Sequence, residues 1–325
     1  MTFTELPFEQ QQELYRAAAG HVLERHGLAG AELADITFVN NATFQARAGD
    51  RELAVRIYRP RQSSGRAIRT ELAWLGAIHG QTALSVPRPL VPPDGDPLIR
   101  FRPAAGDDAL YGVAFAWLPG ASPAPAEHTP ALAERIGAVI GRLHEHSRRF
   151  SPTGEHPRRK LTANQFVFWR LVDRHTPGLF RPEHRPVFAA VERRVKELFR
   201  RFAAHDYGLV HADLIWKNIL VDGPLIRLID FESCAWGYYP YDLAPLLLNY
   251  LGEASYRELR AAALAGYRSV QPLDLDDGEI DVLIAARHTR SCFWMALHLD
   301  NPGLREQAPA AVAMRLEEIA ALLNL

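Results

Sequence analysis

Three oxygen-bearing side chains in one stretch of the chain have the spacing of a site that handles phosphate. Asp213 and Asn218 are separated by four residues inside His211–Leu220, and Asp230 follows the next apolar run. Aspartate can orient or accept the proton of an attacking hydroxyl, while aspartate and asparagine oxygens suit Mg²⁺. The H-x-D-x-x-x-x-N spacing followed by D-F-x is typical of phosphoryl transfer from a nucleotide. We therefore predict Asp213 as the catalytic base and Asn218 and Asp230 as metal ligands.

Apolar residues on both sides place this stretch at the ends of short strands. Leu209-Val210 comes before it and Leu225–Ile229 after it, and we expect the turn Asp222-Gly223-Pro224 to join these strands. His211 is expected to hold the loop through hydrogen bonds. Any one of these polar residues alone would usually cap a turn, so the prediction depends on their joint spacing.

A nucleotide also needs a cation for its phosphates in the N-terminal part of the chain, where no lysine precedes Lys160. Kinase-type enzymes usually place a lysine on the third strand and pair it with a glutamate on a helix. Arg56 stands in that place, on a predicted strand before a helix that carries Glu71. Because arginine keeps its charge and holds phosphate oxygens bidentately, we expect an Arg56–Glu71 pair that binds the nucleotide. The alternative is an exposed Arg56 and a solvated Glu71.

The turn that would cover the phosphates lacks the usual glycines. Val39-Asn40-Asn41 precedes Thr43-Phe44 without any G-x-G-x-x-G pattern. Asparagine tolerates a left-handed backbone, so this turn can form without glycine. Asn41 is a candidate for contact with phosphate oxygens, and a purely structural hairpin is the alternative.

Hydrophobic periodicity predicts a small β-rich part followed by a large helical part. Helical spacing is found at 8–27 and 64–79, and alternation predicts strands at 35–39, 43–47, 52–58, 98–102 and 112–118. Beyond a proline-rich segment, helices are expected at 130–147, 162–174, 183–204, 241–251, 254–269, 277–300 and 305–323. The predicted fold class is α+β, with a small antiparallel β-rich lobe that binds nucleotide (1–118), a hinge (119–125) and a mainly helical lobe (126–325).

Composition argues against several classes of protein. The 325 residues carry a formal net charge of −1, so we expect no nucleic-acid partner, which would require a basic excess. The chain lacks a run of about 18 apolar residues, so no membrane span is expected. The first residues have neither the basic start nor the apolar core of a signal peptide. With only Cys234 and Cys292, no disulfide framework or metal cluster is expected, and a cytoplasmic location is the simplest expectation.

Two further clusters suggest other chemistry. His144-Glu145-His146 resembles the start of a zinc-binding helix, but Arg148 occupies the position of the second required histidine, so we expect a satisfied or solvated patch. The basic group Arg287, His288 and Arg290 could line a substrate cleft or simply cover a helix face. We favour the helix face.

These motifs resemble those of the aminoglycoside phosphotransferase/choline kinase family of kinase-like enzymes. The stretch VHADLIWKNILVDG followed by LIRLIDFE is similar to the family's H-G-D-x-x-x-x-N-I-L and hydrophobic-D-F/W-E patterns. Asn41-Ala42-Thr43-Phe44 is similar to its N-x-x-[YF] nucleotide loop, and Tyr241-Asp242-Leu243-Ala244 to its D-L-A at a helix start. The resemblance implies a two-lobed protein-kinase-like fold, ATP and Mg²⁺ as cofactors, and Asp242 as structural support for the loop.

The sequence departs from the family pattern at three places. Ala212 stands where the family has glycine, Arg56 where it has lysine, and Ile215-Trp216-Lys217 where it commonly has H-P-G. We expect Trp216 to shape the acceptor cleft and Lys217 to approach the transferring phosphate. Glu232 is a candidate for recognition of a cationic acceptor in the same cleft.

The expected function is ATP-dependent transfer of the γ-phosphate to a hydroxyl of a small molecule. Arg56-Ile57-Tyr58-Arg59-Pro60 is similar to the bacterial stress response kinases, so a protein Ser/Thr kinase is the first alternative. A nucleotide-binding pseudokinase that acts through partners is the second. The presence of Asp213, Asn218 and Asp230 together argues against the pseudokinase.

Overall fold

The computed structural model describes residues 3–38, 41–103, 108–151, 157–166, 172, 176, 178–202, 206–299 and 301–325. The chain divides into two compact units, one built mainly from Met1–Pro119 and the other from Gly120–Phe150 and Arg158–Leu325. The division at Pro119 falls inside the segment predicted as a hinge, and the hinge itself stays a prediction. The elements of the two units make a mixed α and β fold, as the sequence predicts.

The first unit is built on a five-stranded sheet in which every neighbouring pair of strands is antiparallel. In chain order the strands are β1 (Glu32–Thr37), β2 (Ala42–Ala48), β3 (Arg51–Tyr58), β4 (Ile99–Phe101) and β5 (Leu110–Ala116). Their spatial order is β1-β2-β3-β5-β4, so β3 lies in the middle of the sheet. The predicted strands are confirmed, with shifts of a few residues at their ends.

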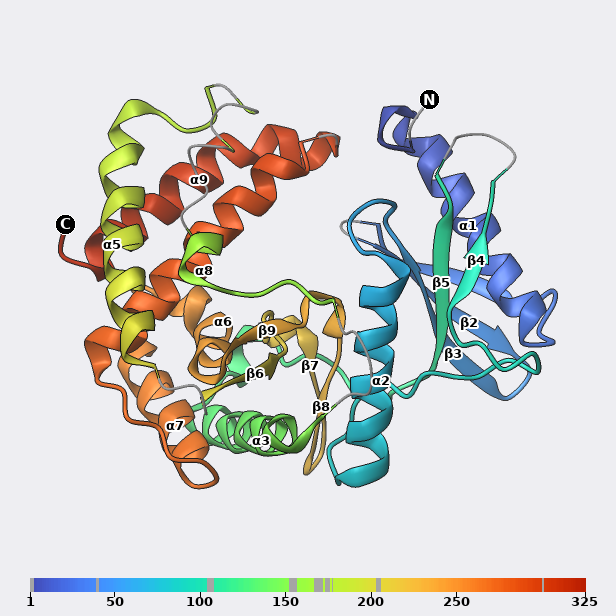
Figure 1. Cartoon of the computed structure of the whole chain (residues 1–325), viewed down its shortest axis with the longest axis horizontal. Helices are drawn as coiled ribbons and strands as arrows, with labels where there is room; N and C mark the ends of the chain where they lie inside the picture. Colours follow the sequence, from blue (N-terminus) through green and yellow to red (C-terminus); the bar gives the residue numbers. More distant parts are fainter. Residues whose placement is uncertain are drawn as a thin grey trace. The chain divides into compact units, whose positions relative to one another are not determined.

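Two helices lie on opposite sides of this sheet, as Figure 1 shows for α1 (Phe8–Arg25) and α2 (Gly65–Gln81). Val55 of β3 is fully buried in the core that α1 closes. Because side chains alternate along a strand, Arg56 points to the other face, where α2 carries Glu71. The alternation of side chains along β3 thus places Arg56 beside α2, while Val55 and Ile57 on either side of it are buried in the core.

The second unit is mainly helical. Its longer helices lie near the predicted ranges and are α3 (Pro130–Arg149), α5 (Arg185–Arg201), α7 (Tyr256–Arg268), α8 (Asp277–Leu297) and α9 (Pro302–Leu322). Helices α8 and α9 pack against each other along their length (Figure 1). In the described part of the chain, no helix is both long and apolar enough to cross a membrane.

Helices α3 and α7 make a close pair with glycines at their contact. A Cβ atom on Gly137 would overlap the carbonyl oxygen of Ala263, and a Cβ atom on Gly266 would overlap that of Glu134. The two backbones therefore approach more closely than any side chain at these positions would permit. The same contact brings the first of these helices, which carries the predicted His144-Glu145-His146 cluster, against the second.

Two short antiparallel ribbons carry the predicted motif. β6 (Tyr207–Val210) pairs with β9 (Ala235–Tyr238), and β7 (Ile219–Asp222) pairs with β8 (Leu225–Leu228). The expectation that the turn Asp222-Gly223-Pro224 joins the strand before the motif to the strand after it is wrong, because this turn joins β7 to β8. The end of the motif is itself the strand β7, and the tight turn at Gly223 folds β8 back onto it, so β6 pairs with β9 instead.

The segment 241–251, expected as one helix, is divided into three short pieces: a 3-10 segment (Tyr239–Leu243), the α-helix α6 (Ala244–Leu247) and a second 3-10 segment (Leu248–Tyr250). Pro245 lies inside this range and lacks the N–H that a continuous helix would need from it. In the range 162–174 the structure has a 3-10 turn over Ala163–Phe166, and most of the rest lies outside the described residues.

Candidate active site

The loop between β6 and β7 is fixed by a buried carboxylate. Asp242 is fully buried, and its two oxygens accept the backbone N–H groups of His211 at 2.7 Å and Ala212 at 2.6 Å. Hydrogen bonds to an ionised carboxylate are stronger than those between neutral groups, so Asp242 holds this turn firmly. Ala212 has a φ of 69°, a left-handed conformation that favours glycine. The predicted supporting residue therefore meets the loop at the point where its backbone is most strained.

A second buried group holds Asp242 in place. His144 of α3 is fully buried, and its Nε2 lies 3.1 Å from Asp242 Oδ2. Its Nδ1 lies 3.0 Å from the hydroxyl of Tyr267 on α7. Burial lowers the pKa of His144 although Asp242 opposes the shift, so the neutral ring donates to Asp242 and accepts from Tyr267. The prediction of a satisfied patch is correct for His144, but the sequence did not indicate that it supports the loop.

His211 joins the loop to the end of β8. Its Nε2 donates to the carbonyl oxygen of Ile229 at 2.9 Å, and its Nδ1 accepts the backbone N–H of Asp213 at 3.3 Å. The ring is fully buried against Phe231, with 4.4 Å between the ring centroids. Both ring nitrogens are thus engaged inside the protein, and the structural role of His211 stays a prediction.

The carboxylate of Asp213 is held from two sides. Asn218 Nδ2 donates to the backbone oxygen of Asp213 at 2.9 Å and to its Oδ2 at 3.3 Å. On the other side, Arg287 Nη2 of α8 donates to Oδ1 at 2.5 Å. The interpretation that Arg287 only covers a helix face is wrong, because this side chain reaches the predicted catalytic residue. Helical spacing alone did not show which element that face meets.

Arg287 also sets the charge state of Asp213. Burial raises the pKa of this carboxyl group, but the charge and hydrogen bond of Arg287 outweigh burial and hold the pKa below its usual value. Burial in turn lowers the pKa of Arg287, and the charge of Asp213 more than compensates. Both groups are therefore ionised near neutral pH, and the 24% exposed carboxylate remains reachable from solvent.

Asn218 and Asp230 lie close together at the open end of the β7–β8 ribbon. The backbone N–H of Ile229 donates to the carbonyl oxygen of Asn218 at 2.9 Å, so Asp230 is one residue beyond this pairing. Asp230 has φ 67° and ψ 55°, a left-handed conformation that aspartate tolerates. The side-chain nitrogen of Asn218 donates to Asp213, so the side-chain oxygen of Asn218, Oδ1, is the atom that could bind a cation.

The Asn218 amide oxygen and the Asp230 carboxylate are the candidate ligands for a metal ion. In the described ranges, no group of three or more His, Cys, Asp or Glu side chains could hold a metal by themselves. Mg²⁺ does not require such a cage, since it usually takes one or two carboxylates and completes its shell with phosphate and water. An amide oxygen and a carboxylate beside Asp213 therefore fit magnesium delivered with a nucleotide.

The other predicted residues of this unit differ in exposure. Lys217 is exposed on the turn before β7. Trp216 is only 4% exposed, donates from Nε1 to the carbonyl oxygen of Leu246 at 2.8 Å and stacks on His128 at 3.8 Å between ring centroids. These contacts hold the loop that carries Trp216 against Leu246 and His128. The contact of Trp216 with an acceptor stays a prediction, as does that of the half-buried Glu232.

The remaining predicted residues lie in the sheet unit. Arg56 Nη1 lies 3.0 Å from Glu71 Oε1, with side-chain exposures of 10% and 0%, so the expected ion pair is present and buried. Asn41 is 7% exposed and accepts the backbone N–H of Arg59 at 2.8 Å. Two residues of the predicted phosphate turn, Val39 and Asn40, lie outside the described residues.

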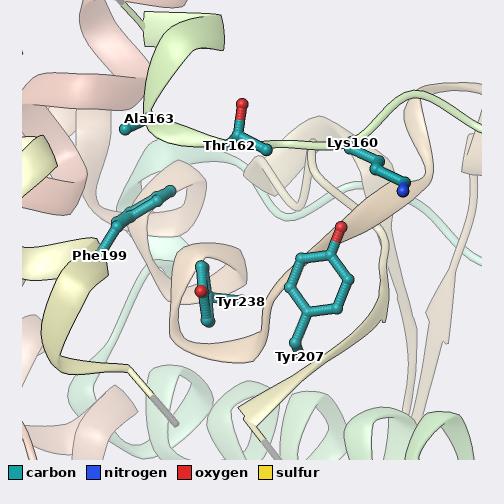
Figure 2. A pocket seen from close by; sticks show the side chains of 6 residues that line it. All are labelled: Lys160, Thr162, Ala163, Phe199, Tyr207 and Tyr238. Atoms are coloured by element: carbon teal, nitrogen blue, oxygen red, sulfur yellow. The ribbon is translucent and has the colours of Figure 1, made fainter. Parts of the chain in front are cut away.

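A separate hollow of about 420 Å³ lies in the helical unit (Figure 2). Aromatic rings form one side of it and a polar segment the other; its lining residues are Lys160, Thr162, Ala163, Phe199, Tyr207 and Tyr238. Tyr207 begins β6 and Tyr238 ends β9, and the two are paired in register. The hollow therefore lies at the end of the ribbon opposite to the Asp213 loop and takes no lining residue from the candidate site.

His288, next to Arg287 on α8, is expected to make the helical unit less stable in acid. Burial and the charges of Arg315 and Arg287 lower the pKa of His288 from 6.5 to about 3, even though Glu318 Oε2 lies 3.3 Å from its Nε2. The unfolded chain binds a proton below about pH 6.5 and the folded chain does not, so stability falls as the pH drops through this window. Urea unfolding should show a loss from this residue of about 2 kcal/mol between pH 7 and pH 5.

The pH 7 to pH 5 difference is compared between the wild type and His288→Gln, which removes the titrating group. The variant should lose less stability than the wild type over this interval, whatever its stability at pH 7. Equal losses in the two proteins would show that His288 does not titrate in this way.

The chain is similar to known phosphotransferases and kinases. The family model described as the phosphotransferase enzyme family matches residues 38–276. Amicoumacin kinase of Bacillus subtilis (strain 168) is 24% identical over 248 residues, which cover 75% of this chain and 69% of that protein. Homoserine kinase of Neisseria meningitidis serogroup B (strain ATCC BAA-335 / MC58) is 34% identical over 74 residues. That match covers 22% of this chain and only 24% of the homoserine kinase.

Solved structures show the same fold over nearly the whole chain. A microcompartment-associated aminopropanol kinase has a TM-score of 0.78 and 23% identity, covering 95% of this chain and 98% of its own. The amicoumacin kinase hAmiN, in complex with AMP-PNP, Ca²⁺ and Ami, has a TM-score of 0.73 and 21% identity, covering 97% of this chain and 94% of its own. The predicted protein-kinase-like fold and the predicted family resemblance are both confirmed. The chain belongs to the phosphotransferase enzyme family.

Proposed function

We propose that this protein is an ATP-dependent kinase that moves the γ-phosphate to a hydroxyl of a small molecule. The observation that carries the proposal is the Asp213 carboxylate, ionised and fixed between Asn218 and Arg287 in a loop braced by Asp242. Relatives named as amicoumacin, aminopropanol and homoserine kinases act on small molecules, which favours such an acceptor over a protein. A protein Ser/Thr kinase remains the alternative that the experiment below separates.

In the proposed reaction Asp213 orients the acceptor hydroxyl and accepts its proton as transfer proceeds. The acceptor oxygen forms a bond to the γ-phosphorus while the bond from that phosphorus to the β–γ bridging oxygen breaks, so ADP leaves with the electron pair. The low pKa of Asp213 makes it a weak base, which suits a loose transition state in which positioning matters more than early proton removal. The proton then passes from Asp213 to solvent.

Asn218 and Asp230 would hold Mg²⁺, which neutralises charge on the phosphates when it is bound. Arg56, oriented by Glu71, would bind phosphate oxygens of ATP, and Lys217 and Asn41 would add a cation and an amide. In this proposal the segment 1–118 is the nucleotide-binding lobe, 119–125 the hinge and 126–325 the catalytic lobe, in a cytoplasmic protein. The AMP-PNP bound by the amicoumacin kinase hAmiN supports ATP as the nucleotide.

Two substitutions of Arg56 test its part in nucleotide binding. Arg56→Lys keeps a cation beside Glu71 and restores the residue that the family usually has, so the KM for ATP should stay within about tenfold of the wild type. Arg56→Gln removes the charge, and the KM for ATP should rise about 10- to 100-fold. Steady-state kinetics with saturating acceptor measure both values. Equal KM values for Gln and wild type would contradict the assignment.

The proposed function is tested by ADP release from Mg-ATP across a panel of amino alcohols, hydroxy amino acids, sugars and aminoglycosides. At least one acceptor should stimulate release well above the rate without acceptor. Self-phosphorylation of the protein, with no stimulation by any small molecule, would favour the protein Ser/Thr kinase instead.

A further inference from the structure

Arg287 contacts the candidate catalytic aspartate, and two further arginines, Arg290 and Arg159, lie on elements beside it. Arg287 and Arg290 are three residues apart on α8 and therefore lie on one face of that helix. Arg159 comes from the segment before Ala163, which is held beside β9 because the backbone N–H of Trp236 donates to the carbonyl oxygen of Arg159 at 2.9 Å. Arg159 Nη2 donates in turn to the carbonyl oxygen of Ser233, three residues beyond the predicted metal ligand Asp230, at 2.9 Å.

Only one of these three cations has a carboxylate partner within the described part of the chain. Arg287 is paired with Asp213. Arg290 Nη1 donates to the hydroxyl of Tyr241 at 3.0 Å, and Arg159 bonds a backbone carbonyl, so neither has its charge neutralised by these contacts. Each of them retains guanidinium N–H groups for a further acceptor. Among the described residues, Arg290 and Arg159 thus have neutral hydrogen-bond partners and no carboxylate partner.

Arg290 lies one helical turn from Arg287, which contacts Asp213, and its partner Tyr241 precedes Asp242, which braces the Asp213 loop. Arg159 is exposed, and the charges that act on it are those of Arg290 and Arg158, with the Glu232 carboxylate opposing them. The charge of Arg290 also helps to hold down the pKa of Asp213. The guanidinium groups of Arg290 and Arg159 repel each other because both are positively charged. An anion bound between them would offset this repulsion. Arg290, Arg159 and Arg158 thus outnumber the Glu232 carboxylate at this edge of the site, and the excess of positive charge suits an anionic group on the acceptor.

We propose that the acceptor carries a carboxylate beside its hydroxyl, and that Arg290 and Arg159 bind this carboxylate while the hydroxyl faces Asp213. The guanidinium fork matches a carboxylate bidentately, which fixes the direction of the hydroxyl as well as adding affinity. This assignment rests on the proposed function and narrows it to hydroxy acids or hydroxy amino acids. Arg287 takes a different part, since it orients the Asp213 carboxylate directly.

The same cations could instead bind the phosphates of the nucleotide, and kinetics separate the two cases. Loss of a carboxylate contact changes the preference between acceptors and leaves the KM for ATP unchanged. Loss of a nucleotide contact raises the KM for ATP and weakens every acceptor equally.

The test uses the full chain with Mg-ATP and two acceptors that differ only in charge, L-homoserine and L-homoserine amide. The wild type should prefer the acid by about 10- to 100-fold in kcat/KM. Arg290→Gln should bring the two acceptors within about threefold of each other, and Arg290→Lys should keep part of the preference. Arg193→Gln, which removes an exposed arginine on α5, is the matched control and should keep the wild-type preference. A phosphorylated hydroxy compound, glycerol 3-phosphate, serves as a separate anionic acceptor.

Three outcomes would overturn the assignment. The wild type could use the amide as well as the acid, Arg290→Gln could raise the KM for ATP without changing the preference, or glycerol 3-phosphate could be used far better than either. If the protein transfers phosphate to no acceptor, the proposed function fails. Calorimetry then tests, without any turnover, whether the site binds a carboxylate. Binding of 4-hydroxybutanoate but not 1,4-butanediol, lost in Arg290→Gln, would support the carboxylate site, and equal binding would refute it.

Discussion

Replacing Gly266 with alanine is expected to lower the free energy of unfolding of the helical unit by about 3 kcal/mol. A Cβ atom at this position would overlap the carbonyl oxygen of Glu134 on α3, and a backbone atom cannot rotate away as a side chain can. The helices must therefore separate or bend to admit one methyl group. In thermal unfolding the loss corresponds to a decrease of about 6–12 °C in the melting temperature.

The same substitution should reduce activity more than its effect on stability explains. Separation of α3 from α7 disturbs the contact between His144 and Tyr267, and His144 is the group that holds Asp242. Asp242 in turn fixes the backbone of Ala212, which is strained in its left-handed conformation. The folded fraction of Gly266→Ala, measured below its melting temperature, should therefore have a lower kcat than the wild type.

Gly76→Ala provides the matched control. Gly76 lies inside the helix α2, is exposed, and has no atom within 4 Å of the position that a Cβ would take. Alanine there should raise stability by about 0.5–1 kcal/mol because it favours the helix and restricts the unfolded chain. A Gly266→Ala protein that is as stable as the wild type would contradict the close packing of α3 and α7.

Replacing Asp213 with asparagine is expected to lower kcat by about 10²- to 10⁴-fold with little effect on the KM for ATP. Asparagine has nearly the same shape and can still accept a hydrogen bond from Arg287. It cannot take the proton of the acceptor hydroxyl, and it lacks the charge that orients that group. The loss should therefore appear in the chemical step, measured by steady-state kinetics at saturating ATP and acceptor.

Asp222→Asn is the control for this change. Asp222 ends β7 on the same ribbon and is 52% exposed, with its carboxylate paired to Arg227. The same chemical change there should leave kcat within about twofold, because this exposed carboxylate lies at the end of β7 away from Asn218 and is not part of the candidate site. If Asp213→Asn and Asp222→Asn had equal kcat values, Asp213 would not be the catalytic residue.

The residues of the candidate site that the sequence already places together share one property. Asp213, Asn218 and Asp230 lie within eighteen positions of one another, so strand and turn signals alone place them at one end of a short ribbon. The Arg56–Glu71 pair was predicted on the same basis, since it joins a strand to the next helix. Sequence spacing is sufficient to predict that two side chains lie close together when the chain between them is too short to separate them.

Groups that come from distant elements could not be predicted in this way. Arg287 is 74 residues from Asp213 in the sequence, and His144 is 98 residues from Asp242. Helical periodicity indicates which residues of α8 share a face, but not which element that face meets. The sequence also cannot show whether a histidine such as His144 is buried or solvated. That depends on the packing of α3 on α7.

The strands on either side of the tight turn were predicted wrongly for a related reason. Ile219-Leu220 was counted as part of the catalytic motif, although the β-branched residues Ile219 and Val221 favour a strand. The tight turn at Gly223 then pairs β7 with β8, and the strand at Leu209 pairs with β9 instead. Strand order depends on which partner is free once the shortest hairpin has formed, and the motif itself gives no information about that choice.

The central claim, that the Asp213 loop transfers the γ-phosphate of ATP to an acceptor hydroxyl, is tested most directly by identifying the product. Purified protein, Mg-ATP and the best acceptor of the panel are incubated, and ADP and the phosphorylated acceptor are quantified by chromatography and mass spectrometry. The wild type should form ADP and an acceptor phosphate monoester in equal amounts, and Asp213→Asn should form neither at a comparable rate. ADP accompanied only by free phosphate, or product formation that Asp213→Asn does not slow, would contradict the claim.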